Sequence, residues 1–317
     1  MSGGNSGRGV VGRLALLVHG CAALGPPWLI RGYFRLMSLF SRSLLPRASQ
    51  RRLLSSMRGR AWPEMVFAPC RITLGRQTAV RLIPHRGEFD EQALYSRRLD
   101  YEPAVFDWLE QRASDYDLVI EIGANIGVYS VFLDALARRR PVERPLRIVA
   151  FEPSSEAYRR LQMNLAANDA CSVTAFRSAV GETFGQRTFY EPADHLTNGS
   201  FVRTFAEKFS SNIVESTVAV VGPHEIETWL KPSKRALIKI DVEGFEPQLL
   251  EVLRPLIERY RPDLLIEVLP DTVEALAIHR ALAGYERFLI TGEGPQKSDA
   301  LYFSQQYFDW LLTWPRA

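Results

Sequence analysis

The sequence contains few cysteines and no uninterrupted apolar run long enough to span a membrane. Its three cysteines, Cys21, Cys70 and Cys171, are too few and too scattered for a disulfide framework or a zinc site, because both need clustered ligands. We therefore expect a reducing, cytoplasmic environment. A spanning helix needs about 20 consecutive apolar residues, and none occurs, so no transmembrane helix is predicted.

Acidic residues are absent from residues 1–60, which contain ten arginines, so the rest of the chain has 29 basic and 36 acidic residues. An acidic body is a poor candidate for binding a phosphate backbone, so no nucleic-acid partner is expected. For residues 1–60 three interpretations remain: a basic surface for anionic membranes, helical packing onto the following domain, and a targeting peptide.

Beyond residue 60 the pattern predicts a small β cap over residues 61–100 and a main domain over residues 101–317. In the main domain, near-continuous apolar strands alternate with amphipathic helices, which predicts an α/β fold with a doubly wound, mostly parallel sheet. The expected strands cover residues 117–122, 146–151, 172–176, 217–221, 236–240 and 263–268. Residues 181–214 show no regular pattern.

A glycine turn follows the first of these strands, in the sequence Glu121-Ile-Gly123-Ala-Asn125-Ile-Gly127. Glycines at the carboxyl end of a parallel strand let the backbone approach a ligand closely, which indicates a nucleotide-like cofactor. The dinucleotide fingerprint would need glycines where the sequence has Asn125 and Val128, so a pyrophosphate-containing cofactor is disfavoured.

A carboxylate ends the second strand, at Glu152 before Pro153. An ionised carboxylate can accept hydrogen bonds from both hydroxyls of a ribose, and this is the role we expect. The alternative is an acid that stabilises the dipole of the following helix.

A second ionisable cluster, Lys239, Asp241 and Glu243, lies at the end of the strand over residues 236–240. Alternation places the three side chains on one side of the strand, at the same sheet edge as the glycine turn. Such groups are costly to bury unless they bind something, although a capping acid is the alternative. His195 lies in the irregular stretch and is either a base or substrate ligand or a solvated side chain. For Glu267 two roles remain open: structural pairing, or a place in the acceptor site.

The strings EIGANIG, VAFEPSSEAYRRLQMNLAAN, ALIKIDVEGFEPQLLEVL and PDLLIEVL resemble the FkbM family of methyltransferases over about residues 100–270. The resemblance implies a seven-stranded sheet whose last strand is antiparallel and S-adenosylmethionine as methyl donor. It also implies an O-methyltransferase that acts on hydroxyl groups of sugars, glycolipids or secondary metabolites, so we expect a small-molecule, carbohydrate or glycolipid acceptor.

The resemblance assigns the donor site to the glycine turn, with Glu121 at the methionine part and Glu152 at the ribose. The donor-site residues are Tyr101, Glu102, Glu121, Gly123, Ala124, Asn125, Gly127, Glu152 and Pro153. Lys239, Asp241, Glu243 and His195 are the catalytic candidates; Asp241 can orient the acceptor hydroxyl, take its proton or hold a divalent cation. Phe245 departs from the family's usual alanine. The competing functions are a nicotinamide-dependent oxidoreductase and a non-catalytic, membrane-associated scaffold.

Overall fold

The structure is a computed structural model that describes residues 67–85, 88–94, 96–141, 143, 145–193 and 198–315, together with 26, 28–30, 32–34 and 36. The chain divides into two compact units. The first consists of Met1–Thr73 and Arg81–Tyr101, and the second of Leu74–Val80 and Glu102–Ala317.

In the first unit, a small apolar cluster joins the described part of the N-terminal segment to later residues. Ile30 and Phe34 are buried against Phe67 and Leu94, and the rings of Phe34 and Phe67 meet edge to face at 5.5 Å. Strands β1 (Cys70–Leu74) and β2 (Thr78–Leu82) form a two-stranded sheet, and a short 3-10 helix covers Phe89–Leu94. Both strands lie within residues 61–100, the region in which the sequence pattern predicts a small β cap.

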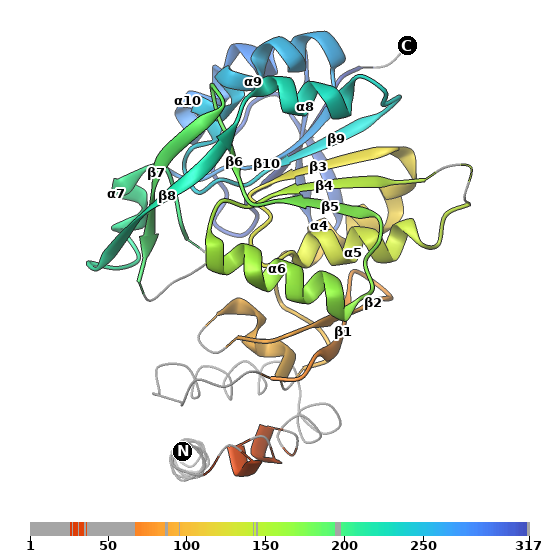
Figure 1. Ribbon diagram of the computed structural model, residues 1–317. Helices are drawn as coiled ribbons and strands as arrows, with labels where there is room; N and C mark the ends of the chain where they lie inside the picture. The colour runs from red at the N-terminus through yellow and green to blue at the C-terminus, as the bar shows by residue number, and fades with distance from the viewer. Residues whose placement is uncertain are drawn as a thin grey trace, which may run out of the picture. The chain divides into compact units, whose positions relative to one another are not determined.

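The second unit is built on an eight-stranded sheet in the order β12-β11-β13-β10-β9-β3-β4-β5 (Figure 1). The strands are β3 (Leu118–Ile122), β4 (Arg147–Phe151), β5 (Val173–Phe176), β9 (Ala236–Ile240), β10 (Asp263–Glu267), β11 (Glu286–Thr291), β12 (Gly294–Ser298) and β13 (Asp309–Thr313). Neighbours from β5 to β10 are parallel, and β13 is antiparallel to both β10 and β11.

The predicted α/β fold with a mostly parallel sheet is thus confirmed, and the expected antiparallel last strand, β13, is present. The strand count differs: β12 pairs antiparallel with β11 and adds an eighth strand at the edge. It is a polar strand, GPQKS, which lacks the apolar run that marks a buried strand.

Helices cover both faces of this sheet, which explains why its central parallel strands are mostly apolar. They are α4 (Pro103–Arg112), α5 (Val128–Ala137), α6 (Ser155–Ala167), α8 (Pro223–Leu230), α9 (Glu246–Tyr260) and α10 (Val273–Ala277). On one face, Ile120, Ile238 and Ile266 belong to a core that includes Leu250 and Leu253 of α9. Figure 1 shows α4, α5 and α6 on the opposite side of the sheet from α8 and α9.

The stretch expected to be irregular contains a second sheet instead. It has three strands in the order β6-β8-β7, namely β6 (Ala179–Val180), β7 (Gly185–Pro192) and β8 (Ile213–Val221), with the short helix α7 (Arg203–Ala206). The prediction of irregular structure was wrong for β7, and the strand predicted at 217–221 belongs to this sheet. We call β6, β7, α7 and β8 the inserted sheet, because it contributes no strand to the central one.

Candidate functional site

The turn after β3 has the backbone conformation for which glycine is best suited. Gly123, Asn125 and Gly127 have φ angles of 90°, 50° and 78°, which lie in the left-handed region. A Cβ atom on Gly123 would lie 1.7 Å from the backbone oxygen of Asp241. The glycine therefore brings the end of β3 directly against the end of β9.

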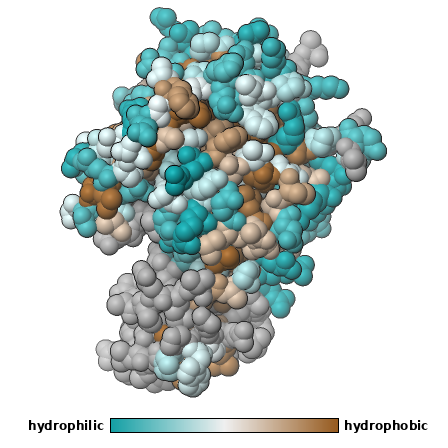
Figure 2. Space-filling model, viewed as in Figure 1, coloured by the Kyte–Doolittle hydropathy of each residue, from teal (hydrophilic) through white to brown (hydrophobic). Residues whose placement is uncertain are grey.

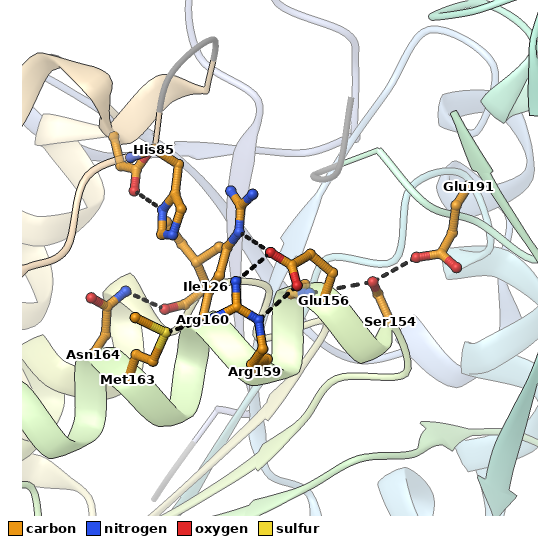
Figure 3. Close-up of polar contacts among 11 residues, drawn as sticks. His85, Ile126, Ser154, Glu156, Arg159, Arg160, Met163, Asn164 and Glu191 are labelled. Carbon is orange, nitrogen blue, oxygen red and sulfur yellow. Dashed lines mark hydrogen bonds and ion pairs between the residues drawn. The ribbon is translucent and has the colours of Figure 1, made fainter. Parts of the chain in front are cut away.

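A side chain of α6 forms a hydrogen bond to the backbone of this turn. Asn164, which is buried, donates from Nδ2 to the backbone oxygen of Ile126 at 2.8 Å (Figure 3). Within the turn, Oδ1 of Asn125 is buried and has no hydrogen-bond partner among the described residues. A buried acceptor without a partner costs free energy, so the turn presents an atom that a ligand donor would satisfy.

Glu152 joins the turn to the end of β4. Its Oε2 accepts from the backbone N–H of Asn125 at 2.7 Å, and its Oε1 accepts from that of Ser154 at 2.8 Å. Burial raises the pKa of Glu152 to about 7, although the two N–H donors oppose the shift. Because each carboxylate oxygen has two lone pairs, both can accept a further hydrogen bond from a ligand.

Glu121 and Lys239 lie side by side on β3 and β9, where the two residues are in register. Glu121 accepts from the Ser130 hydroxyl, and burial raises its pKa to about 7. The Lys239 ammonium is 2.6 Å from Oδ2 of Asp241 and 4.4 Å from the centre of the Tyr129 ring. Burial opposes the charge of Lys239, but the surrounding carboxylates outweigh it and raise its pKa.

Tyr129 extends the same contacts to α4, since its hydroxyl donates to Glu102. The structure thus brings Glu102, Glu121, Lys239 and Asp241 together, and their roles in donor binding and catalysis stay predictions. Tyr101 belongs to the first unit, where its ring stacks on Phe89 at 4.3 Å.

Further carboxyl groups gather at the carboxyl ends of β9 and β10 and at the amino end of the antiparallel strand β13. Burial, followed by repulsion from Asp241, raises the pKa of both Glu243 and Glu267. Burial also raises the pKa of Asp309, which lies in register with Glu267. This edge therefore has several carboxyl groups around one buried lysine. Protonation of some of these carboxyl groups reduces their mutual repulsion.

Sequence reasoning did not identify the role of Glu246. Its Oε1 accepts from the backbone N–H groups of Val242 and Gly244, both at 3.1 Å. These bonds hold the turn over residues 241–244, in which Glu243 and Gly244 have φ angles of 55° and 91°. The available signal was an acid directly before Pro247, two residues after Gly244, where the helix α9 begins.

The inserted sheet reaches the ends of three strands of the central sheet. Ser154, after β4, donates to Glu191 of β7 at 2.6 Å (Figure 3). Ser200 donates to the backbone oxygen of Glu243, after β9, at 2.7 Å. Lys208 and Asp271, which follows β10, form an ion pair. Figure 1 shows β7, β8 and α7 beyond this end of the sheet, and in Figure 2 their outer surface is largely hydrophilic.

His195 lies outside the described residues, so its role stays a prediction. Phe245 is buried, with 6% of its surface exposed. In the part of the chain that the structure describes, no group of three or more His, Cys, Asp or Glu residues could hold a metal ion, so the divalent-cation role of Asp241 receives no support.

A cavity of about 680 Å³ lies away from these residues. It is bounded by α4, by the edge strands β11 and β12, and by Trp314, and none of the predicted site residues lines it. The chemistry-bearing side chains therefore gather at the carboxyl edge of the sheet, outside this cavity.

Comparisons with known proteins identify the family. The model of the methyltransferase FkbM domain matches residues 121–287, just over half of the chain. No curated protein matches the sequence.

Similar solved structures include methyltransferase FkbM from Methylobacillus flagellatus KT, with 18% identity and a TM-score of 0.40 over 62% of this chain. This chain spans only 44% of that one. A SAM-dependent methyltransferase from Agrobacterium tumefaciens is 11% identical over 80% of this chain and 72% of its own, with a TM-score of 0.39. The O-methyltransferase TomG from Streptomyces achromogenes is 15% identical over 65% of this chain and 77% of its own, with a TM-score of 0.34. These likenesses are distant, and the assignment rests on the family model: the chain belongs to the FkbM methyltransferase family.

Proposed function

We propose that this protein transfers a methyl group from S-adenosylmethionine to a hydroxyl oxygen of a small-molecule, carbohydrate or glycolipid acceptor. The observation that carries the proposal is the junction of the turn after β3 with Glu152, through the 2.7 Å hydrogen bond from Asn125. The junction offers a carboxyl group and the unpartnered Oδ1 of Asn125. A ribose and an amine-bearing nucleoside supply the matching donors.

The donor-side residues fit this cofactor without a phosphate site. Glu152 would hold the ribose hydroxyls, the turn over residues 123–127 would lie against the nucleoside, and Glu121 would face the methionine part. When bound, S-adenosylmethionine supplies an electrophilic methyl group on a sulfonium. A nicotinamide dinucleotide would instead need close approach of its pyrophosphate at positions 125 and 128, where the chain has Asn125 and Val128.

On the acceptor side, the residues at the end of β9 orient the hydroxyl and take its proton. We assign proton acceptance to the Asp241 carboxylate, which is fixed by its ion pair with Lys239. Glu243, whose pKa is raised by burial and by Asp241, holds a proton more readily and can donate a hydrogen bond to the acceptor. The protein thus aligns the acceptor and relocates one proton, the two tasks that an in-line methyl transfer requires.

The donor assignment is tested by comparing S-adenosylhomocysteine with NAD in thermal unfolding of the full-length protein. A ligand at 100 times its dissociation constant should stabilise the native state by about 2.7 kcal/mol. We expect S-adenosylhomocysteine to raise the melting temperature and NAD to leave it unchanged. Stabilisation by NAD alone would refute the proposal.

The role of Asp241 is tested by Asp241→Asn, which keeps the shape and removes the charge. Turnover, followed as transfer of a labelled methyl group to cell-extract components, should fall by about 100-fold or more. The melting temperature should stay near that of the wild type, because loss of the Lys239 pair is offset by weaker repulsion on Glu243 and Glu267. The exposed Asp299→Asn serves as control. Full activity of Asp241→Asn, or joint loss of stability and donor binding, would contradict the assignment.

A further inference from the structure

One face of β7 is directed at the carboxyl edge of the central sheet. Because side chains alternate along a strand, Arg187, Phe189 and Glu191 share this face. Glu191 contacts Ser154 at the end of β4. Phe189 is buried and meets Phe201 edge to face at 5.4 Å. Arg187 is therefore the basic residue on this face.

Arg187 rests on two aromatic rings next to the turn at the end of β9. Its guanidinium carbon is 4.5 Å from the centre of the Phe201 ring and 4.9 Å from that of Phe245. Phe201 follows Ser200, which is bonded to the backbone of Glu243, and Phe245 follows Gly244. The guanidinium thus lies one ring away from the turn that carries Asp241 and Glu243.

The charge of Arg187 is not used within the described structure. The side chain is exposed, and among the described residues it forms no ion pair and no side-chain hydrogen bond. Arg203 of the same inserted sheet differs, because it pairs with Glu207 at 2.9 Å and with Glu215 at 2.7 Å. Stacking on the rings orients the guanidinium plane and leaves its edge N–H groups available for a partner that accepts two parallel hydrogen bonds.

We propose that Arg187 binds an anionic oxyacid group of the methyl acceptor: a phosphate, a sulfate or a carboxylate. This inference rests on the proposed function, since it names the class of molecule that the same site methylates. The carboxylate of Asp241 would repel an anion at the reacting centre itself. The anionic group is therefore separated from the reacting hydroxyl by the width of the Phe201 and Phe245 rings.

The test measures anion binding to the full-length protein by thermal unfolding. Inorganic phosphate, sulfate and acetate are titrated separately at constant ionic strength, with chloride making up the difference. The variants are Arg187→Gln, Arg187→Lys and, as a charge-matched control, Lys231→Gln. Lys231 is exposed and follows α8, at the amino end of β9 and thus away from the proposed site.

We expect at least one anion to stabilise the wild type and Lys231→Gln equally. Arg187→Gln should raise its apparent dissociation constant at least tenfold, and Arg187→Lys should give an intermediate value because lysine cannot bind in a bidentate manner. The anion that produces the effect identifies a phosphorylated, sulfated or carboxylated acceptor. No stabilisation of the wild type by any of the three, or equal stabilisation of Arg187→Gln, would overturn the inference.

Titration of S-adenosylhomocysteine in the same series separates this inference from the proposed function. The donor product should stabilise Arg187→Gln as much as the wild type, which also shows that the variant is folded. Arg187-dependent anion binding without any response to S-adenosylhomocysteine would refute the methyltransferase proposal and keep the anion site. Stabilisation by S-adenosylhomocysteine without any Arg187-dependent anion binding would refute the anion site and leave the methyltransferase proposal intact.

Discussion

Glu152 has two tasks at once, because the carboxyl group proposed to bind the ribose also bonds to the backbone of Asn125 and Ser154. Glu152→Ala removes both a ligand acceptor and the link between the turn and β4. We expect S-adenosylhomocysteine binding to weaken by about 2–4 kcal/mol, measured by titration calorimetry, since charge-assisted hydrogen bonds are lost. Unchanged affinity would remove Glu152 from the donor site.

A matched control for this substitution lies in the first turn of α6. Glu156→Ala removes an acid of α6 whose partners are Arg159 and Arg160 on the same helix. These pairs do not reach the turn after β3. Glu156→Ala should therefore leave the affinity for S-adenosylhomocysteine unchanged.

At the scale of elements, the close approach of β3 and β9 depends on Gly123. In Gly123→Ala the new Cβ would collide with the backbone oxygen of Asp241, and the residue would keep a φ of 90°. Strain and overpacking together should lower the free energy of unfolding by about 2–5 kcal/mol in urea titrations. Gly185→Ala is the control, because no heavy atom lies within 4 Å of its added Cβ and its φ is not positive. Equal stability of both variants would show that the strand ends separate at little cost.

Elements defined by local signals could be predicted from the sequence. The position of Ser154 before an amphipathic run is typical of a helix cap, and its hydroxyl accepts from the N–H of Ala157 at 3.3 Å at the start of α6. The apolar strands could also be predicted, because a strand that is buried on both faces has a continuous run of apolar residues. Strand β7 could not be predicted, because its buried and exposed residues do not alternate regularly and its pairing with β8 joins residues far apart in the chain.

The same distinction applies to the site. Sequence spacing identified the glycine turn, Glu152 and the ionisable groups of β9 as candidates. Asn164, Ser200 and Arg187 do not, because each acts through a contact with a residue at least 38 positions away, as in the bond from Asn164 to Ile126. Such contacts depend on the arrangement of whole elements rather than on neighbouring sequence.

For the whole molecule, the buried carboxyl groups predict how stability varies with pH. Burial raises the pKa of Glu121, Glu152 and Glu246 to about 7, against an ordinary value of 4.5. The folded state therefore binds protons more tightly than the unfolded state between these values. The free energy of unfolding should fall as the pH rises from about 4.5 to about 7, by roughly 1 kcal/mol per pH unit and group.

Urea titrations across this pH window check the direction and the origin of the effect. Glu246→Gln should flatten the dependence, since it removes one group that takes up a proton on folding while keeping the oxygen that accepts from Val242 and Gly244. Stability that increases over this range would show that these carboxyl groups are ionised in the folded protein.

The N-terminal segment concerns the whole molecule in another way, through its placement in the cell. Among the described residues no helix is long and apolar enough to cross a membrane. We propose that the ten arginines of residues 1–60 attach the protein to anionic lipid surfaces, each contributing about 1 kcal/mol at most. Replacing all ten by glutamine should abolish sedimentation with anionic liposomes.

Substitution is the better test than deletion, because Ile30 and Phe34 pack against Phe67 and Leu94. Removal of residues 1–60 would expose that cluster and confuse loss of charge with loss of structure. Neutral liposomes provide the reference. Equal sedimentation of the substituted and unsubstituted proteins with anionic liposomes would contradict membrane attachment through these arginines.

The inserted sheet has a consequence for how such enzymes diversify. It occupies one continuous stretch, from Ala179 in β6 to Val221 in β8, and adds no strand to the central sheet. Under the proposed function, mutation or recombination confined to this stretch would change acceptor recognition and leave the residues proposed to bind the donor unchanged. Contacts such as that between Glu191 and Ser154 are the points at which a change on one side would require a change on the other. Evolution could in this way alter the proposed acceptor while the proposed donor chemistry is kept.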